Sequence, residues 1–200
     1  MRLHAVSDLH VLPHQWSLGM GIDPCGRFLI ADSEPARLWD TMTGRCCLTI
    51  ADFSADTVNW AFSDGGNTLI TGGRGRHGRL WDCASGRLIR ELRGHWRSVR
   101  CVALSADGLT AATGSDDGRV RIWDVATGRP RQTLRAHNGP VYSVAVNRSG
   151  TIALCGNRGS ATAWNATSGR QLHEFQDLGG IAWIAQLSGD GRIALTLANE

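Results

Sequence analysis

The chain has 200 residues, of which 42% are hydrophobic and 20% are charged, and its formal net charge is +3. This composition is typical of a soluble globular domain, and the net charge is too small and the basic residues too dispersed to indicate a nucleic-acid-binding face. No apolar run of roughly 18 residues occurs, and Met1–Gln15 lacks the apolar region of a signal peptide, so we predict neither a membrane span nor a leader.

Short strand-like runs follow one another along the chain, beginning with Leu3–Val6. Alternating apolar pairs then occur at Met20 and Ile22, Trp60 and Phe62, Val144 and Val146, and Ala185 and Leu187. The clearest runs are Leu88–Leu92, Ser98–Leu104, Leu109–Thr113 and Arg119–Asp124. No stretch keeps the helical period of about 3.6 residues for long, so we predict an all-β fold.

A repeat of about 42 residues organises these runs. Its first landmark is a Trp followed directly by Asp or Asn, which recurs at intervals of 42, 42 and 41 residues: Trp39-Asp40, Trp81-Asp82, Trp123-Asp124 and Trp164-Asn165. The second is a turn glycine three residues after a Ser, Asp or Asn: Gly26, Gly66, Gly108, Gly150 and Gly191. Two landmarks in one register predict a repeat domain over residues 1–200, with units at about 3–40, 47–82, 88–124, 130–165 and 171–200.

The third unit contains Gly94-His95, Ser105–Gly108, Gly114–Gly118 and Ile122-Trp123-Asp124. It resembles a WD40 repeat of the G-protein β-subunit type, and the resemblance extends over most of the chain. That family folds each repeat into a four-stranded blade of a β-propeller. The resemblance therefore implies WD40 β-propeller blades, four complete repeat units plus an incomplete fifth, and hence an incomplete or open propeller.

The same resemblance implies that His95, Thr113, Asp117 and Trp123 form a hydrogen-bonded structural tetrad. A His, Asp and Thr could also form a nucleophilic triad, but the Trp and the blade spacing explain all four residues together. We expect His95→Ala to lower thermal stability, by about 1–3 kcal/mol, without a catalytic defect.

The other units keep only parts of this tetrad: His137, Trp164, Trp39 and Trp81. In the fourth unit Cys155 replaces the Thr and Arg158 falls near the Asp position. In the second unit Gly72–Gly78 replaces the Asp turn, and in the first Ser33–Pro35 occupies it, with His14 one residue out of register. We expect one complete tetrad and looser blades elsewhere.

We predict no metal site and no cofactor. Pro13 prevents a helical pairing of His10 with His14, and no third ligand stands near them. The Gly72–Gly78 segment lacks the Gly-Lys-Ser/Thr ending of a phosphate-binding loop. The six cysteines form no C-x-x-C pair, so we interpret most as small buried hydrophobic side chains in a reducing, cytoplasmic setting.

In the family, partners commonly dock on the face that carries the loops entering each innermost strand. The matching positions here are Trp16, Leu18, Asp56, Val58, Ser98, Arg100, Asp116, Pro140, Tyr142, Gly180 and Trp183. Trp, Tyr and Arg are the residues that dominate protein interfaces. In the alternative interpretation, Trp16 and Trp183 simply fill the rim. The mixed charge of this set indicates no particular class of partner.

We therefore predict a non-catalytic protein–protein interaction scaffold whose partners are other proteins, with no nucleic acid and no membrane. The alternative is the C-terminal sensor or regulatory portion of a larger signalling ATPase or protein kinase. A propeller enzyme is disfavoured, since no matched carboxylate pair or His cluster is present. Seven blades would need about 290 residues at this period, so a fragment, a self-associating partial ring and an open arc all stay open.

Overall fold

The structure, a computed structural model, describes residues 20–31, 35–50, 59–73, 75–136 and 138–199. These residues form eighteen β-strands and no helix, which confirms the all-β prediction. In particular, the described part of the chain has no helix able to cross a membrane.

The strands form consecutive antiparallel meanders. The first sheet contains β1 (Met20–Ile22), β2 (Phe28–Ala31), β3 (Ala36–Asp40) and β4 (Cys46–Ile50). The second contains β5 (Asn59–Phe62), β6 (Thr68–Gly72), β7 (His77–Asp82) and β8 (Leu88–Arg93). The third contains β9 (Val99–Leu104), β10 (Thr110–Ser115), β11 (Arg119–Asp124) and β12 (Pro130–Arg135). The fourth contains β13 (Ser143–Val146), β14 (Ile152–Gly156), β15 (Ala161–Asn165) and β16 (Gln171–Phe175). The fifth contains β17 (Ile181–Leu187) and β18 (Ala194–Asn199).

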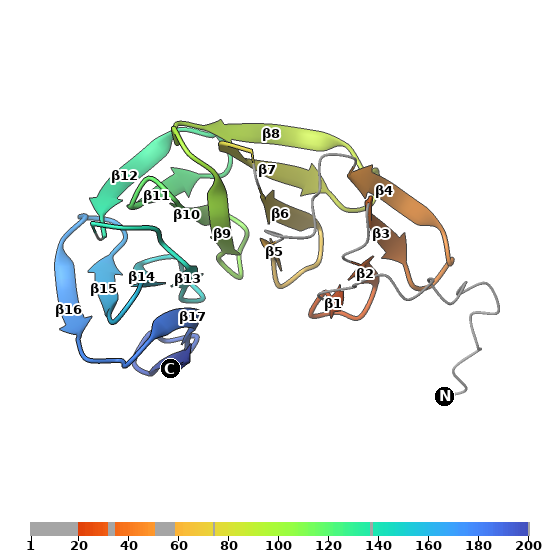
Figure 1. The fold of residues 1–200 in the computed structure, drawn as a ribbon. Coiled ribbons are helices and arrows are strands. Elements are labelled where there is room, and N and C mark those ends of the chain that lie inside the picture. The colour runs from red at the N-terminus through yellow and green to blue at the C-terminus, as the bar shows by residue number, and fades with distance from the viewer. Residues whose placement is uncertain (1–19, 32–34, 51–58, 74, 137, 200) are drawn as a thin grey trace.

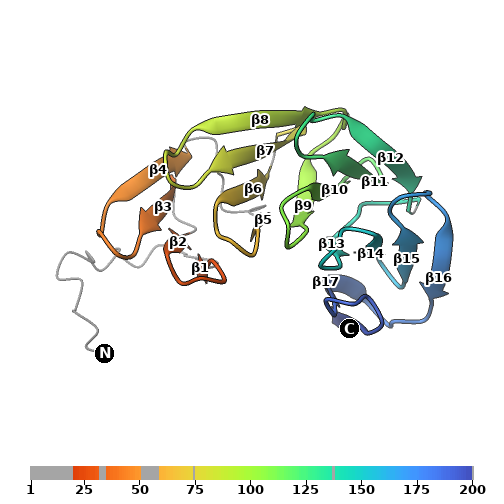
Figure 2. The same ribbon diagram turned by 180° about the vertical axis from the view of Figure 1, so that it is seen from behind.

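The sheets stand side by side in an open arc (Figure 1). The first strand of each sheet lies on the inside of the arc, and β4, β8, β12 and β16 form its outer rim, as the reverse view also shows (Figure 2). The arc does not close into a ring, so the prediction of an incomplete propeller is confirmed.

Each sequence unit after the first begins with a strand that belongs to the preceding sheet. The predicted unit 88–124 starts at β8, but β8 pairs with β7 of the second sheet, Leu92 opposite Gly78. The sequence repeat and the sheet are therefore out of phase by one strand. One sequence unit therefore supplies the outer strand of one sheet and the first three strands of the next, which ties neighbouring sheets together.

The hydrophobic core lies between the sheets, because their strands are apolar on both faces. In β9, Val102 and Leu104 pack toward the second sheet, while Cys101 and Ala103 pack toward the fourth. Further clusters fill the spaces between the first and second sheets and between the fourth and fifth. On the first sheet Met20 and Ile22 are 67% and 57% exposed, because no described sheet covers that side.

Three glycines at the ends of the second strands let the next sheet approach closely. Gly72, Gly114 and Gly156 recur at 42-residue intervals. A β-carbon added at Gly114 would lie 2.7 Å from Val141 Cγ1, and one at Gly156 would lie 2.7 Å from Ala182 Cβ. These separations are too short for a side chain.

On one side of the arc, the turns between the first and second strands of neighbouring sheets are joined in a row. The Asp64 N–H donates to the Ala106 carbonyl at 2.9 Å, and the Ala106 N–H donates to the Arg148 carbonyl at 3.1 Å. The Arg148 N–H continues the row to the Gly189 carbonyl at 3.1 Å. Arg148 also forms a 3.0 Å ion pair with Asp64, two sheets away, so the turns converge on this side.

The cysteines are less buried than predicted. Cys83, Cys101 and Cys155 are buried, but Cys46 and Cys47 are half-buried and Cys25 is exposed, and all six are free. The prediction that most are buried is therefore wrong. Cys46 and Cys47 begin β4 on the outer rim, where Cys47 packs only partly against the cluster between the first and second sheets. Cys25 lies in the β1–β2 turn, and its thiol reaches the Asp64 carbonyl at 3.3 Å while the residue stays exposed.

Candidate partner-binding site

The third sheet contains a continuous chain of four hydrogen-bonded side chains. His95 lies in the loop before β9, Thr113 in β10, Asp117 in the β10–β11 turn and Trp123 in β11. The Trp123 indole N–H donates to Thr113 Oγ1 at 2.8 Å, and Thr113 Oγ1 lies 2.8 Å from His95 Nε2. His95 Nδ1 lies 2.8 Å from Asp117 Oδ2, and both of these side chains are fully buried.

Asp117 also fixes the loop and the turn that it joins. Its carboxylate accepts the backbone N–H of Arg119 at 3.0 Å and that of Trp96 at 3.4 Å. Burial lowers the pKa of His95, against the opposing effect of the Asp117 carboxylate. A neutral imidazole therefore joins the loop entering β9 to the β10–β11 turn.

The second sheet contains half of this arrangement. The Trp81 indole N–H donates to Thr71 Oγ1 at 2.9 Å. The sequence did not predict Thr71, although it lies 42 residues before Thr113, because the second unit lacks the Asp turn that marks the motif. Gly75 stands at the Asp position, so the second sheet has the hydroxyl and the indole without the carboxylate.

In the first and fourth sheets the hydroxyl is missing. Strand register places Ala31 opposite Arg37, as Thr113 lies opposite Arg121, so Trp39 has no threonine partner. In the fourth sheet Cys155 occupies the position, and the buried Trp164 indole N–H makes no hydrogen bond to an oxygen among the described residues. Burial raises the pKa of Cys155 to about 12, although its contact with Trp164 acts in the opposite direction. His137 lies outside the described residues.

Four predicted face residues come together across three sheets. Arg100 of β9 forms an ion pair with Asp116 of the β10–β11 turn. The Arg100 guanidinium lies 5.3 Å from the centre of the Tyr142 ring, which precedes β13. The Tyr142 ring packs edge-on against Trp183 of β17, with 5.0 Å between ring centres. We call Asp116, Arg100, Tyr142 and Trp183 the inter-sheet row.

The remaining predicted face residues are less informative. Ser98 offers its carbonyl to the Asp116 N–H at 3.0 Å, so its backbone supports the row. Pro140 lies in the loop entering β13, and Gly180 accepts the Gly159 N–H at 2.7 Å. Trp16, Leu18, Asp56 and Val58 lie outside the described residues, as do Leu3–Val6, His10, His14, Ser33 and Glu34.

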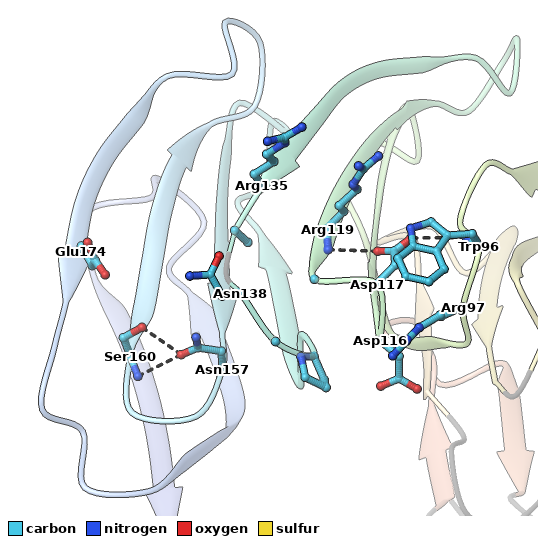
Figure 3. A pocket seen from close by; sticks show the side chains of 14 residues that line it. Trp96, Arg97, Asp116, Asp117, Arg119, Arg135, Asn138, Asn157, Ser160 and Glu174 are labelled. Carbon is cyan, nitrogen blue, oxygen red and sulfur yellow. Dashed lines mark hydrogen bonds between the residues drawn. The ribbon is translucent and has the colours of Figure 1, made fainter.

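A groove of about 780 Å³ opens beside the row, between the third and fourth sheets (Figure 3). Its walls are the loops entering β9 and β13 and the turns β10–β11 and β14–β15, and we call this end of the sheets the loop face. Its charged and aromatic lining consists of Trp96, Arg97, Asp116, Asp117, Arg119, Arg135 and Glu174. Trp96 is 53% exposed.

Sequence reasoning missed Trp96, Arg119 and Arg135 as face residues. Trp96 directly follows the tetrad His95, which is a usable signal, since the loop that holds His95 must lie at the loop face. Arg135 ends β12, and nothing in its spacing indicates that the outer strand reaches the groove.

Metal and phosphate sites have no support in the described ranges. No group of three or more His, Cys, Asp or Glu side chains there could hold a metal ion. Gly73, in the glycine-rich segment, forms a bridge with Val99 of the third sheet, so its backbone is engaged between sheets. The Thr113 hydroxyl is buried and bonded on both sides, which leaves it no access to a substrate.

Comparison with protein-family models matches the chain to the WD domain, G-beta repeat, at residues 86–124 and 128–165. The two matches end at the Trp123-Asp124 and Trp164-Asn165 pairs. Comparison with curated proteins gives no match.

Proposed function

The chain is a WD40-repeat protein, and from that premise we propose that it is a non-catalytic scaffold that binds partner proteins at its loop face. WD40 repeats are generally protein-interaction scaffolds. The proposal adds the place where binding occurs. The fold alone does not determine where a partner binds, so the support for this place must come from the residues of the loop face.

The inter-sheet row is the observation that carries the proposal. It aligns an Arg, a Tyr and a Trp over three successive sheets, and Trp183 remains 47% exposed. Contacts between the side chains hold them in place before a partner arrives, which reduces the conformational entropy lost on binding. Arg, Tyr and Trp are the residue types that contribute most to protein interfaces.

The test is the capture of partners from a lysate of the source organism by the immobilised chain. We expect Arg100→Ala/Tyr142→Ala to lose proteins that the unaltered chain retains. The matched control, Leu109→Ala/Arg129→Ala, removes an exposed apolar and an exposed basic side chain from the opposite end of the third sheet. Trp183→Ala, which leaves the Arg100–Asp116 ion pair in place, should lose the same proteins. Equal recovery by all four chains would contradict the proposal.

A further inference from the structure

We propose that the groove between the third and fourth sheets binds an extended, acidic segment of the partner protein. This inference rests on the proposed function, because it names the chemistry of the partner at the same loop face. A groove of about 780 Å³ lies within the common size range of ligand pockets, roughly 300–1,000 Å³, and can hold several residues of a peptide.

Three arginines line the groove without a carboxylate partner among the described residues. Arg97, Arg119 and Arg135 make no ion pair with any carboxylate in the part of the chain that the structure describes. Arg97 lies over the Trp96 ring, with 4.7 Å between its guanidinium carbon and the ring centre. Planar guanidinium groups bind carboxylates with two parallel hydrogen bonds, which favours an acidic ligand.

Two of these arginines face each other across neighbouring strands. Arg119 of β11 and Arg135 of β12 are direct partners in the antiparallel register, on the groove side of the third sheet (Figure 3). Like charges in directly opposite positions destabilise a sheet. A bound carboxylate would relieve this repulsion, so the pair favours the ligand-bound state.

The acidic side chains of the groove do not neutralise these arginines. Asp117 is buried and bonded to His95 and to two backbone N–H groups, and Asp116 pairs with Arg100. Glu174 of β16 is the remaining carboxylate of the lining, and it lies at the opposite wall from Arg119 (Figure 3). The exposed charge beside β11 and β12 is therefore positive.

A peptide, unlike a single small anion, would use the neutral parts of the lining as well. The half-exposed Trp96 offers an apolar surface next to the arginines, and the exposed Asn138 offers an amide to a peptide backbone. An acidic residue beside an apolar one would match Arg119 and Trp96 together.

The probe is a fluorescein-labelled decapeptide of Glu and Ala with one central Phe, and its affinity for the whole chain is measured by fluorescence anisotropy. Two control peptides replace every Glu by Gln or by Lys. We expect the Glu peptide to bind about tenfold or more tightly than the Gln peptide, because it alone offers charge-assisted hydrogen bonds. Its affinity should fall as salt is raised above about 0.1 M, where the Debye length is about 10 Å.

The variant pair Arg119→Gln/Arg135→Gln should weaken the Glu peptide about tenfold or more and leave the Gln peptide unchanged. Its melting temperature should be equal to or above that of the unaltered chain, because the like-charge pair is gone, whereas a structural role would lower it. Arg129→Gln/Arg170→Gln removes the same charge from exposed turns at the other end of the third and fourth sheets and should bind as the unaltered chain does.

No binding of the Glu peptide, equal binding of the Gln peptide, or equal losses in both double variants would overturn the inference. So would full displacement by inorganic phosphate at concentrations comparable to those of the peptide, which would indicate a small-anion site. If partner capture still depends on Arg100 and Tyr142 in any of these cases, the scaffold proposal stands and only the acidic segment is lost.

Discussion

The Thr113 hydroxyl has two hydrogen-bond partners, Trp123 and His95, and together they fix the direction of its proton. It accepts a hydrogen bond from the Trp123 indole, so its own proton is left for His95 Nε2. His95 must then carry its single proton on Nδ1, where Asp117 accepts it. A protonated imidazole would donate its Nε2–H to Thr113 Oγ1 in addition to the indole N–H of Trp123, and would leave the hydroxyl proton without an acceptor. The tetrad therefore requires a neutral histidine.

This requirement gives a pH dependence with a definite sign. Burial places the pKa of His95 below its ordinary value of 6.5, so the unfolded chain binds a proton first as the pH falls. The stabilisation by His95 is therefore complete above pH 6.5 and is lost progressively below it. The difference in free energy of unfolding between the unaltered chain and His95→Gln, from urea titrations at pH 7.5 to 5.5, should shrink with acidification. A difference that grows would mean that His95 is charged in the fold.

Cys155 offers the complementary test, because there the indole lacks an oxygen acceptor. Cys155→Ser supplies a hydroxyl that can accept from Trp164 and donate to the Thr162 carbonyl, which the thiol contacts at 3.4 Å. We expect the free energy of unfolding to rise by about 1 kcal/mol. Cys101→Ser, the same change at a buried site that has no such indole, should lower it. Denaturant unfolding of both variants decides the matter, and losses in both would contradict the role of Trp164.

At the scale of single residues, the sequence predicted the complete set His95, Thr113, Asp117 and Trp123, because the third unit keeps every member of the motif. It did not predict Thr71, because a partial motif is harder to detect than a whole one. The contact between Arg100 and Tyr142 was also beyond prediction. It depends on the angle between neighbouring sheets, which spacing within one repeat does not determine.

The elements of this fold are stable because each sheet is apolar on both faces and covers its neighbour. Alternation in β9 was readable from the sequence, and its two faces do pack on different sheets. The pairing of β8 with β7 was not readable, since an outer strand alternates in the same way whichever sheet it joins. The strand β9 begins and ends within a residue of its prediction, because the Asp107-Gly108 turn fixes its end.

The close approach of sheets predicts the effect of a single methyl group. Gly114→Ala would place a β-carbon 2.5 Å from Cys101 Sγ of the same sheet and 2.7 Å from Val141 Cγ1 of the loop entering the fourth sheet, so both neighbours must shift. We expect a loss of about 1–3 kcal/mol in the free energy of unfolding, as for other overpacked cores. Gly75→Ala, where a β-carbon meets nothing within 4 Å, should be neutral or slightly stabilising in the same denaturant titration. Equal effects would contradict the close packing of Cys101 and Val141 around Gly114.

The two opposite sides of the arc, each formed by the turns and loops at one end of the strands, differ in a way that matters for function. At one end, successive turns are joined by backbone hydrogen bonds and by the Asp64–Arg148 ion pair. At the other, the loop face carries the inter-sheet row, the groove and the half-exposed Trp96 and Trp183. The first end holds the inner strands together, so the second can present fixed side chains to a partner.

The position of a bound partner can be measured directly by site-specific photocrosslinking in cells of the source organism. The photoreactive residue benzoylphenylalanine replaces Gly139, which lines the groove at the loop face and where an added β-carbon meets nothing within 4 Å, or Leu109, which is 56% exposed in the β9–β10 turn on the opposite side of the sheets. We predict a discrete crosslinked protein from position 139 that is missing from position 109. Crosslinks from position 109 alone, or the same products from both, would contradict the placement of the partner on the loop face.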